Sequence, residues 1–164
     1  MRRNRAGRVV PAVVAAALLA GCTAPAADPG TPTAPVGAPS ASATPARTLT
    51  GDKKATGQAL PAQVAGWTLD RRQTAGGAAS GFYTRPGAQG DLVITLTPVP
   101  LTDDALAHAL DDPQPVGAAT CGVLPGAGTT ACYRPLEGGN LRVAGALPVA
   151  DLAAVADAVH ATLK

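Results

Sequence analysis

The sequence predicts an α+β fold, in which an antiparallel sheet of about six strands has two helices packed on one of its faces. Two observations lead to this prediction. Short segments of strand-like alternation are separated by turn residues, and two further segments space their apolar residues as a helix does. Both patterns lie within residues 57–164, and a chain of 164 residues has room for one such domain.

The first half of this domain is expected to form three strands and a helix. Strands are predicted from Trp67, at 80–85 and at 91–97, where apolar residues alternate onto one face. A helix is predicted from Thr102 to Leu110, because a capping hydroxyl is followed by two aspartates and then by leucines four residues apart.

The second half repeats this order, with three strands and a helix expected at 116–121, 129–135, 140–146 and 149–163. A shift of 49 residues aligns the two halves, and the shared text R-P-x-x-x-G-[DN]-L-x-[IV] begins at Arg85 and again at Arg134. Duplication of a βββα unit would explain the match. Ordinary hairpin turns in an alanine-rich sequence explain it equally well, and both explanations predict the same architecture.

The N-terminus has the pattern of an export signal. Residues 1–8 hold four arginines and no acid, and residues 9–20 form an apolar stretch of 12 that is too short to span a membrane stably. The stretch ends in the tetrapeptide Leu-Ala-Gly-Cys at 19–22, which resembles the lipobox of bacterial lipoproteins. The resemblance covers only this terminus, and it implies that a signal peptide of residues 1–21 is removed and that the thiol of Cys22 receives a diacylglyceryl group. An ordinary secretory signal, in which the cysteine is incidental, is the alternative.

The expected organisation is a signal peptide at 1–21, a tether at 22–56 and a domain at 57–164. The tether is rich in Pro, Ala, Thr and Ser and lacks hydrophobic periodicity, as is typical of a disordered linker. Two or three acyl chains anchor a protein stably. We therefore expect the mature protein on the extracytoplasmic face of the cell membrane, with the acyl chains on Cys22 as its membrane contact.

The positive sign of the formal charge of +2 is due to the expected signal peptide. Four of the 13 basic residues precede Cys22, whereas all 11 acidic residues follow it. The mature chain therefore carries nine basic against eleven acidic side chains, and its net charge gives no reason to expect an anionic partner. Export also separates the chain from nucleic acid, so we expect no nucleic-acid partner.

Cys121 and Cys132 are expected to form a structural disulfide. The exported context is oxidising, and the Gly- and Pro-rich segment between the two cysteines suits a hairpin. A redox pair is weakly supported because the spacing is not C-x-x-C, and a zinc site would need further ligands where only two histidines exist. We expect no cofactor and no metal.

No catalytic motif accompanies these features. His108 and His160 lie in no metalloprotease-like pattern, and no serine lies in a G-x-S-x-G elbow. The acidic pairs at 103–104 and 111–112 are explained by solvation of the two ends of the first helix. Four side chains could line a site for an anionic or sugar-like ligand on the exposed sheet face: Tyr83, Arg85, Tyr133 and Arg134. Solvated positions on edge strands are the alternative interpretation of these four.

Together these observations favour a non-catalytic, lipid-anchored protein of the cell envelope, whose small domain binds an unknown envelope protein or a small ligand. A small envelope enzyme with no recognisable motif is the alternative, and it requires titratable side chains that converge in one pocket. The binding component of an importer is disfavoured, because that class has two-lobed folds much larger than residues 57–164.

Overall fold

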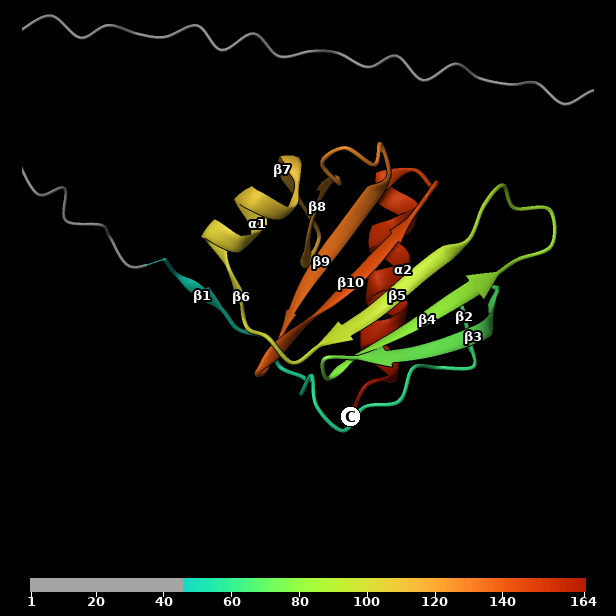
Figure 1. Ribbon diagram of the computed structural model, residues 1–164, viewed down its shortest axis with the longest axis horizontal. Coiled ribbons are helices and arrows are strands. Elements are labelled where there is room, and N and C mark those ends of the chain that lie inside the picture. The colour runs from blue at the N-terminus through green and yellow to red at the C-terminus, as the bar shows by residue number, and fades with distance from the viewer. Residues whose placement is uncertain (1–45) are drawn as a thin grey trace, which may run out of the picture. The chain divides into compact units, whose positions relative to one another are not determined.

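The computed structural model describes residues 46–164, so the signal peptide, the lipobox and most of the expected tether lie outside the described residues. Within residues 46–164 the chain forms an α+β fold with a large sheet, a separate two-stranded sheet and two helices (Figure 1). The strands are β1 (Thr48–Leu49), β2 (Gln63–Val64), β3 (Trp67–Ala75), β4 (Ala78–Thr84), β5 (Leu92–Thr97), β6 (Leu101–Thr102), β7 (Asp111–Val116), β8 (Ala119–Val123), β9 (Thr130–Leu136) and β10 (Gly139–Gly145). The helices are α1 (Asp103–Ala109) and α2 (Val149–Thr162). Neither of these helices is long and apolar enough to cross a membrane.

The large sheet has eight strands in the order β2-β3-β4-β5-β10-β9-β8-β7, and every neighbouring pair is antiparallel. It therefore exceeds the expected six strands by the two edge strands, β2 and β7. β7 contains Pro113 and Pro115, which donate no backbone hydrogen bond and are tolerated at a sheet edge. The strand expected at 116–121 instead spans the turn between β7 and β8, where Gly117 has a φ of 61°.

One face of the sheet packs against α2 and holds most of the core. Leu92, Ile94 and Leu96 of β5 lie on this face, as their alternation predicts, and none is more than 3% exposed. Leu152 and Val159 of α2 are fully buried in the same cluster. Full burial of such side chains contributes about 1.5–3 kcal/mol each. Figure 1 shows α2 behind the strands of the sheet.

The two helices pack on opposite faces, so the prediction that both cover one face is wrong. Side chains alternate along a strand, so Ala131 and Ala144 point away from the face of their neighbours Cys132 and Val143, which belong to the cluster with α2. The two alanines instead pack with Leu106 of α1 in a second, smaller cluster. The spacing of apolar residues shows that a helix has a core-facing side, but it does not show which face of a sheet that side meets.

The two halves of the domain correspond in their strands only. Ile94 and Val143, which the shift of 49 residues aligns, pair directly where β5 meets β10. From this junction the strands follow in the same order on both sides, β5-β4-β3 and β10-β9-β8. The helices, however, have 7 and 14 residues and lie on opposite faces.

The folded part begins before residue 57, where the sequence placed the end of the tether. β1 pairs with β6, and Lys54 forms an isolated parallel bridge with Glu137. Around that bridge the amide of Ala55 donates to the Glu137 carbonyl at 3.0 Å, and the amide of Glu137 donates to the Lys53 carbonyl at 2.7 Å. These are mainly backbone contacts, which leave little hydrophobic pattern in the sequence, and residues 46–56 were therefore assigned to the tether.

Cys121 and Cys132 lie directly opposite each other on β8 and β9 and form a disulfide, with Cα atoms 4.0 Å apart. The expected pairing is thus confirmed. Both cysteines are almost fully buried on the α2 face, at 1% and 0% exposure. The bond therefore joins two strands of the core.

Candidate functional site

A groove on the α1 face of the sheet is the candidate functional site. It encloses about 370 Å³, which is within the size range of small-molecule sites. Strands β5, β9 and β10 supply its floor, and α1 and the segment between β5 and β6 supply its walls.

A row of polar side chains crosses the floor of the groove. Arg142 of β10 pairs with Thr95 of β5 on one side and with Tyr133 of β9 on the other. Ser80 of β4 extends the row, and its Oγ lies 3.1 Å from Oγ1 of Thr95. Thr120 of β8 extends it past Tyr133. Directly opposed residues have Cβ atoms about 4.5–5.5 Å apart, so the row is continuous and Arg142 lies near its centre.

Arg142 is the charged side chain of the groove, and no acidic residue lines the groove with it. Its Nε atom is buried and has no hydrogen-bond partner within residues 46–164. Arg142 takes part in none of the ion pairs that residues 46–164 form with one another. A buried donor without a partner costs about 1–3 kcal/mol, and more if the group is charged. The Nε itself is closed to solvent, but the Arg142 side chain lines the groove, where the terminal nitrogens of a guanidinium can donate paired hydrogen bonds to an oxyanion.

The wall between β5 and β6 is stiff and apolar. Asn140, which is buried, donates from Nδ2 to the carbonyl oxygen of Val99 at 2.9 Å and so fixes this wall to the floor. Val99 lies between Pro98 and Pro100, whose rings restrict the backbone. The Val99 side chain is 57% exposed at the rim of the groove, which makes it the most exposed large hydrophobic residue in the described part of the chain.

The opposite wall is α1, and its cap and core contacts hold it in place. Thr102 caps the helix as the sequence predicts, since its Oγ1 accepts a hydrogen bond from the amide of Ala105 at 3.0 Å. Leu106 anchors the helix in the cluster beneath it. Ala105 and Ala109 line the groove, and their small side chains leave the space that the groove encloses.

This arrangement suits the binding of an oxyanion that carries an apolar group. A guanidinium can donate two parallel hydrogen bonds to a carboxylate or phosphate, and threonine and tyrosine hydroxyls are further donors. No motif in the sequence marks Arg142 as a site residue. Its signal was a lone charge between the apolar residues Leu141 and Val143, which places it on the face opposite the core.

The four side chains that the sequence suggested for a ligand site do not converge, so that site is not formed. Tyr83 is fully buried on the α2 face, and Tyr133 lies on the opposite face, in the groove. Arg85 follows the end of β4, and Arg134 pairs with a residue of α2. Sequence spacing placed the residues on neighbouring strands, but alternation and the strand ends separate them.

Arg85 lies in a second, smaller hollow of about 250 Å³, beside Trp67 and α2. Its guanidinium carbon lies 4.7 Å from the centre of the Trp67 ring, within the range of a cation–π interaction. Asp151 of α2 lines the same hollow. An arginine that is already placed on an aromatic ring beside an acid has less need of an external anion than Arg142 has.

Tyr83 has a structural role. Its hydroxyl donates to the carbonyl oxygen of Pro61 at 2.8 Å and links β4 to the segment before β2. Burial raises the pKa of Tyr83 to about 12, although the positive charge of Arg72 opposes this rise. The neutral, hydrogen-bonded phenol is therefore the form that the fold favours.

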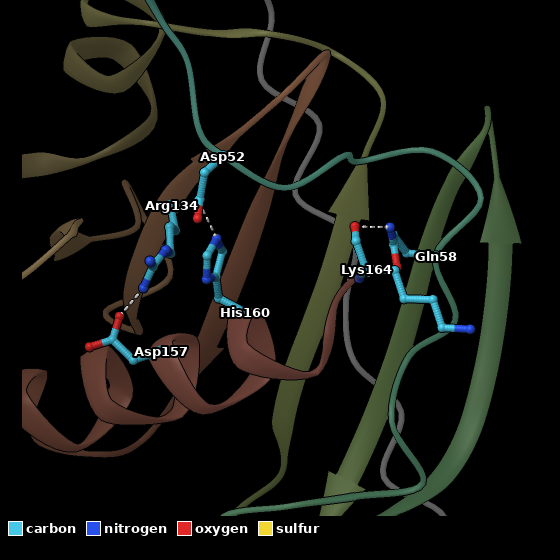
Figure 2. Close-up of polar contacts among 6 residues, drawn as sticks. All are labelled: Asp52, Gln58, Arg134, Asp157, His160 and Lys164. Atoms are coloured by element: carbon cyan, nitrogen blue, oxygen red, sulfur yellow. Dashed lines mark hydrogen bonds and ion pairs between the residues drawn. The ribbon is translucent and has the colours of Figure 1, made fainter.

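Arg134 belongs to a polar cluster that joins α2 to the segment before residue 57 (Figure 2). Arg134 forms an ion pair with Asp157 of α2, and Nε2 of His160 lies 2.9 Å from Oδ1 of Asp52. Nε2 of His160 is buried, and Asp52 is the acidic group that faces it. The pKa of Asp52 is lowered, first by a hydrogen bond with its own backbone and then, against desolvation, by His160 and Arg134.

The two histidines differ in their surroundings. His108 is exposed, and its Nδ1 lies 2.8 Å from the carbonyl oxygen of Asp104. His160, near the end of α2, is only 6% exposed. Neither histidine lines the groove. Within residues 46–164 no group of three or more histidine, cysteine or acidic side chains is placed to hold a metal ion.

Lys164 is hydrogen-bonded to Gln58, which lies between β1 and β2. The side-chain amide of Gln58 donates to the carbonyl oxygen of Lys164 at 2.9 Å and accepts from its backbone amide at 3.0 Å (Figure 2). The Asp52–His160 contact and the Gln58–Lys164 hydrogen bonds therefore join residues 52–58 to the end of α2 and the residues that follow it. Comparison of the chain with protein-family models, with curated proteins and with solved structures finds no match.

Proposed function

We propose that the protein is a lipid-anchored binding module of the cell envelope. In this proposal the acylated Cys22 holds the chain to the membrane, the proline-rich tether follows, and the domain binds its ligand outside the membrane without catalysing a reaction. Support for the anchor comes from the lipobox-like tetrapeptide at 19–22 and the preceding apolar stretch.

The observation that carries the binding role is the groove with Arg142 on its floor. The groove has the size of a small-molecule site, its lining is mainly apolar, and its charged group has an unpartnered buried nitrogen. Apolar walls around a few placed polar groups are typical of ligand sites.

The alternative function, a small envelope enzyme, would use the cluster of Asp52, Arg134, Asp157 and His160. These side chains pair acid with base: Arg134 and Asp157 join β9 to α2, and Asp52 and His160 join the segment before residue 57 to α2. A structural tie accounts for all four. The groove holds one ionisable charge and a phenol, so it lacks the paired titratable groups that acid–base catalysis needs.

The anchor is tested by fractionation of cells that produce the wild-type chain or the Cys22→Ser variant. We expect the wild-type chain in the membrane fraction and the variant in the soluble or secreted fraction, because the serine cannot be acylated. A variant that still sediments with membranes would contradict the lipid anchor.

The binding role is tested by blocking the groove. Ala105→Phe fills it from α1, and Ala107→Phe places the same ring on an exposed position of the helix outside the lining. Proximity labelling in cells should give a different set of neighbours for Ala105→Phe, while Ala107→Phe should match the wild type. Identical sets for all three chains, equal to that of an unrelated tethered domain, would count against a binding role of the groove.

A further inference from the structure

We propose that the groove beside α1 binds a small amphiphilic oxyanion, that is, a carboxylate or phosphate monoester attached to a short apolar body. This inference rests on the proposed function and deepens it, because it names the ligand class for the same groove. The two head groups share one chemistry, and the experiment below distinguishes them.

Arg142 selects the head group. It is the charged residue among those that line the groove, no acid accompanies it there, and its buried Nε has no partner within residues 46–164. The flanking hydroxyls of Thr95 and Tyr133 lie beside it on the adjacent strands. An oxyanion would supply the acceptors that this guanidinium lacks.

The walls select the apolar body. Val99, Leu101, Ala105 and Ala109 surround the polar floor with aliphatic side chains. Val99 is 57% exposed at the rim, so a bound chain could cover apolar surface that is now in contact with water. A bare inorganic anion would leave these contacts unused.

The floor disfavours a sugar or another neutral polyol. Such a ligand needs many free donors and acceptors, but the polar groups of the floor are partly committed. Thr95 is hydrogen-bonded to Ser80, and the amide nitrogen of Asn140 is bonded to the carbonyl of Val99. A cationic ligand would meet Arg142 with no neighbouring acid to offset the repulsion.

The direct test uses five probes and the complete mature chain with Cys22→Ser, which avoids detergent. Octanoate and octyl phosphate carry the proposed head groups, octyltrimethylammonium has the same body with the opposite charge, and acetate and inorganic phosphate lack the body. We expect saturable binding of octanoate, of octyl phosphate or of both by calorimetry, with amide NMR shifts centred on Thr95, Asn140 and Arg142. The tighter of the two identifies the head group.

Matched variants locate the binding. Arg142→Gln should weaken binding of the octyl anions by at least about tenfold, because it removes a charge-assisted interaction. Arg71→Gln removes the same charge from the same face outside the groove, where Arg71 lies over Phe82, and should leave binding unchanged. Ala105→Phe should abolish binding with Arg142 intact, whereas Ala107→Phe should not. Thermal unfolding of each variant establishes that it is folded, and Arg142→Lys retains the charge if the glutamine variant unfolds.

Three outcomes would overturn the proposal: absence of saturable binding of both octyl anions, equal binding of octyltrimethylammonium, or equal loss of binding in Arg142→Gln and Arg71→Gln. These outcomes are separate from failure of the proposed function. If the octyl anions do not bind but Ala105→Phe still changes the neighbours found in cells, the binding role stands and only the ligand class is wrong. If the octyl anions bind but Ala105→Phe leaves the labelled neighbours unchanged, the ligand class is supported and a role of the groove in recruiting partner proteins is excluded.

Discussion

Asp52 connects the protonation of its carboxyl group to the attachment of residues 46–56. Its side chain is exposed, yet its pKa is lowered by its own backbone hydrogen bond and by the charges of His160 and Arg134. In the folded state Asp52 therefore keeps its negative charge to a lower pH than an ordinary aspartate, whose pKa is 3.8. A group with a depressed folded pKa stabilises the fold above its unfolded pKa, and this contribution is lost as the pH falls through the folded pKa.

The first prediction is that Asp52→Asn reduces the acid sensitivity of the fold. As the pH falls below 3.8, the wild-type chain should lose an increment of unfolding free energy that the variant does not lose. Urea unfolding at a series of pH values from about 5 to about 2 measures this difference. Asp91→Asn, which neutralises an exposed acid in the loop before β5, is the control. Identical pH profiles for the two variants would show that Asp52 makes no special contribution.

The second prediction concerns Tyr83. In a Tyr133→Phe chain, Tyr83 is the remaining tyrosine, and its phenolate absorbance should appear with a midpoint near 12 instead of the ordinary 10.0. Because the folded pKa is raised, folding stability should decline as the pH rises above the unfolded value toward about 12. A midpoint close to 10 in the folded chain would mean that the Tyr83 hydroxyl is accessible to water and not held by Pro61.

The disulfide covalently joins β8 to β9, the strand that packs against α2 and contributes Tyr133 to the groove. The two cysteines are separated by 11 positions, and closing a loop of this length lowers the entropy of the unfolded chain. The bond also lies in the core, where Cys121 and Cys132 pack with the other buried residues of the α2 face.

The third prediction is that loss of this bond lowers the free energy of unfolding by about 3 kcal/mol. Denaturant unfolding of the wild-type chain with and without a reductant measures the change. The double variant Cys121→Ala and Cys132→Ala should resemble the reduced wild type, apart from its smaller side chains, and it should not respond to the reductant. A wild-type chain with equal stability in both conditions would contradict a stabilising role.

Sequence periodicity was sufficient for the central elements of the fold. β5 and β10 place apolar residues at every second position on the core face and α2 has a clear apolar stripe, so the sequence predicts their positions within a few residues. β7 is not predicted, because the acidic pair at 111–112 is explained equally well as the end of the first helix, and the two prolines that follow are tolerated only in an edge strand. The face covered by α1 could not be predicted, since it depends on tertiary packing of Leu106 against Ala131 and Ala144.

The candidate site was harder to predict than the fold. Its floor combines residues of three strands that become neighbours only through the pairing of β5 with β10, which joins the two halves of the domain. Tyr133 was named for a ligand site from its type and its neighbour Arg134, but the relevant arginine is Arg142, directly across the strand pair. A local pattern cannot contain that information.

If the chain is anchored through Cys22 as proposed, the start of the folded part determines how many residues separate the anchor from the domain. If the tether runs from 22 to 56, flexible-coil statistics give a mean span of about 30–35 Å, and if it ends at 45 the span is about 25–30 Å. The pairing of β1 with β6 and of Lys54 with Glu137 favours the shorter tether. The domain would then lie closer to its membrane anchor.

The fourth prediction is that residues 46–56 resist trypsin in the folded protein. The peptide groups around Lys53 and Lys54 are bonded to Glu137, so cleavage after either lysine should be much slower in the native chain than in urea-unfolded chain. Mass spectrometry of timed digests identifies the first cuts.

Two alanine positions provide the matched comparison for this test. Ala55 is buried, and its Cβ is packed tightly against Gly139, so Ala55→Gln should detach the segment and restore cleavage after Lys53 and Lys54. Ala59→Gln makes the same substitution at an exposed position and should remain resistant. Rapid cleavage after Lys53 or Lys54 in the wild-type chain would instead support a tether that extends to residue 56. Because both lysines lie between the two candidate boundaries, the position of the first cut distinguishes the two tether lengths.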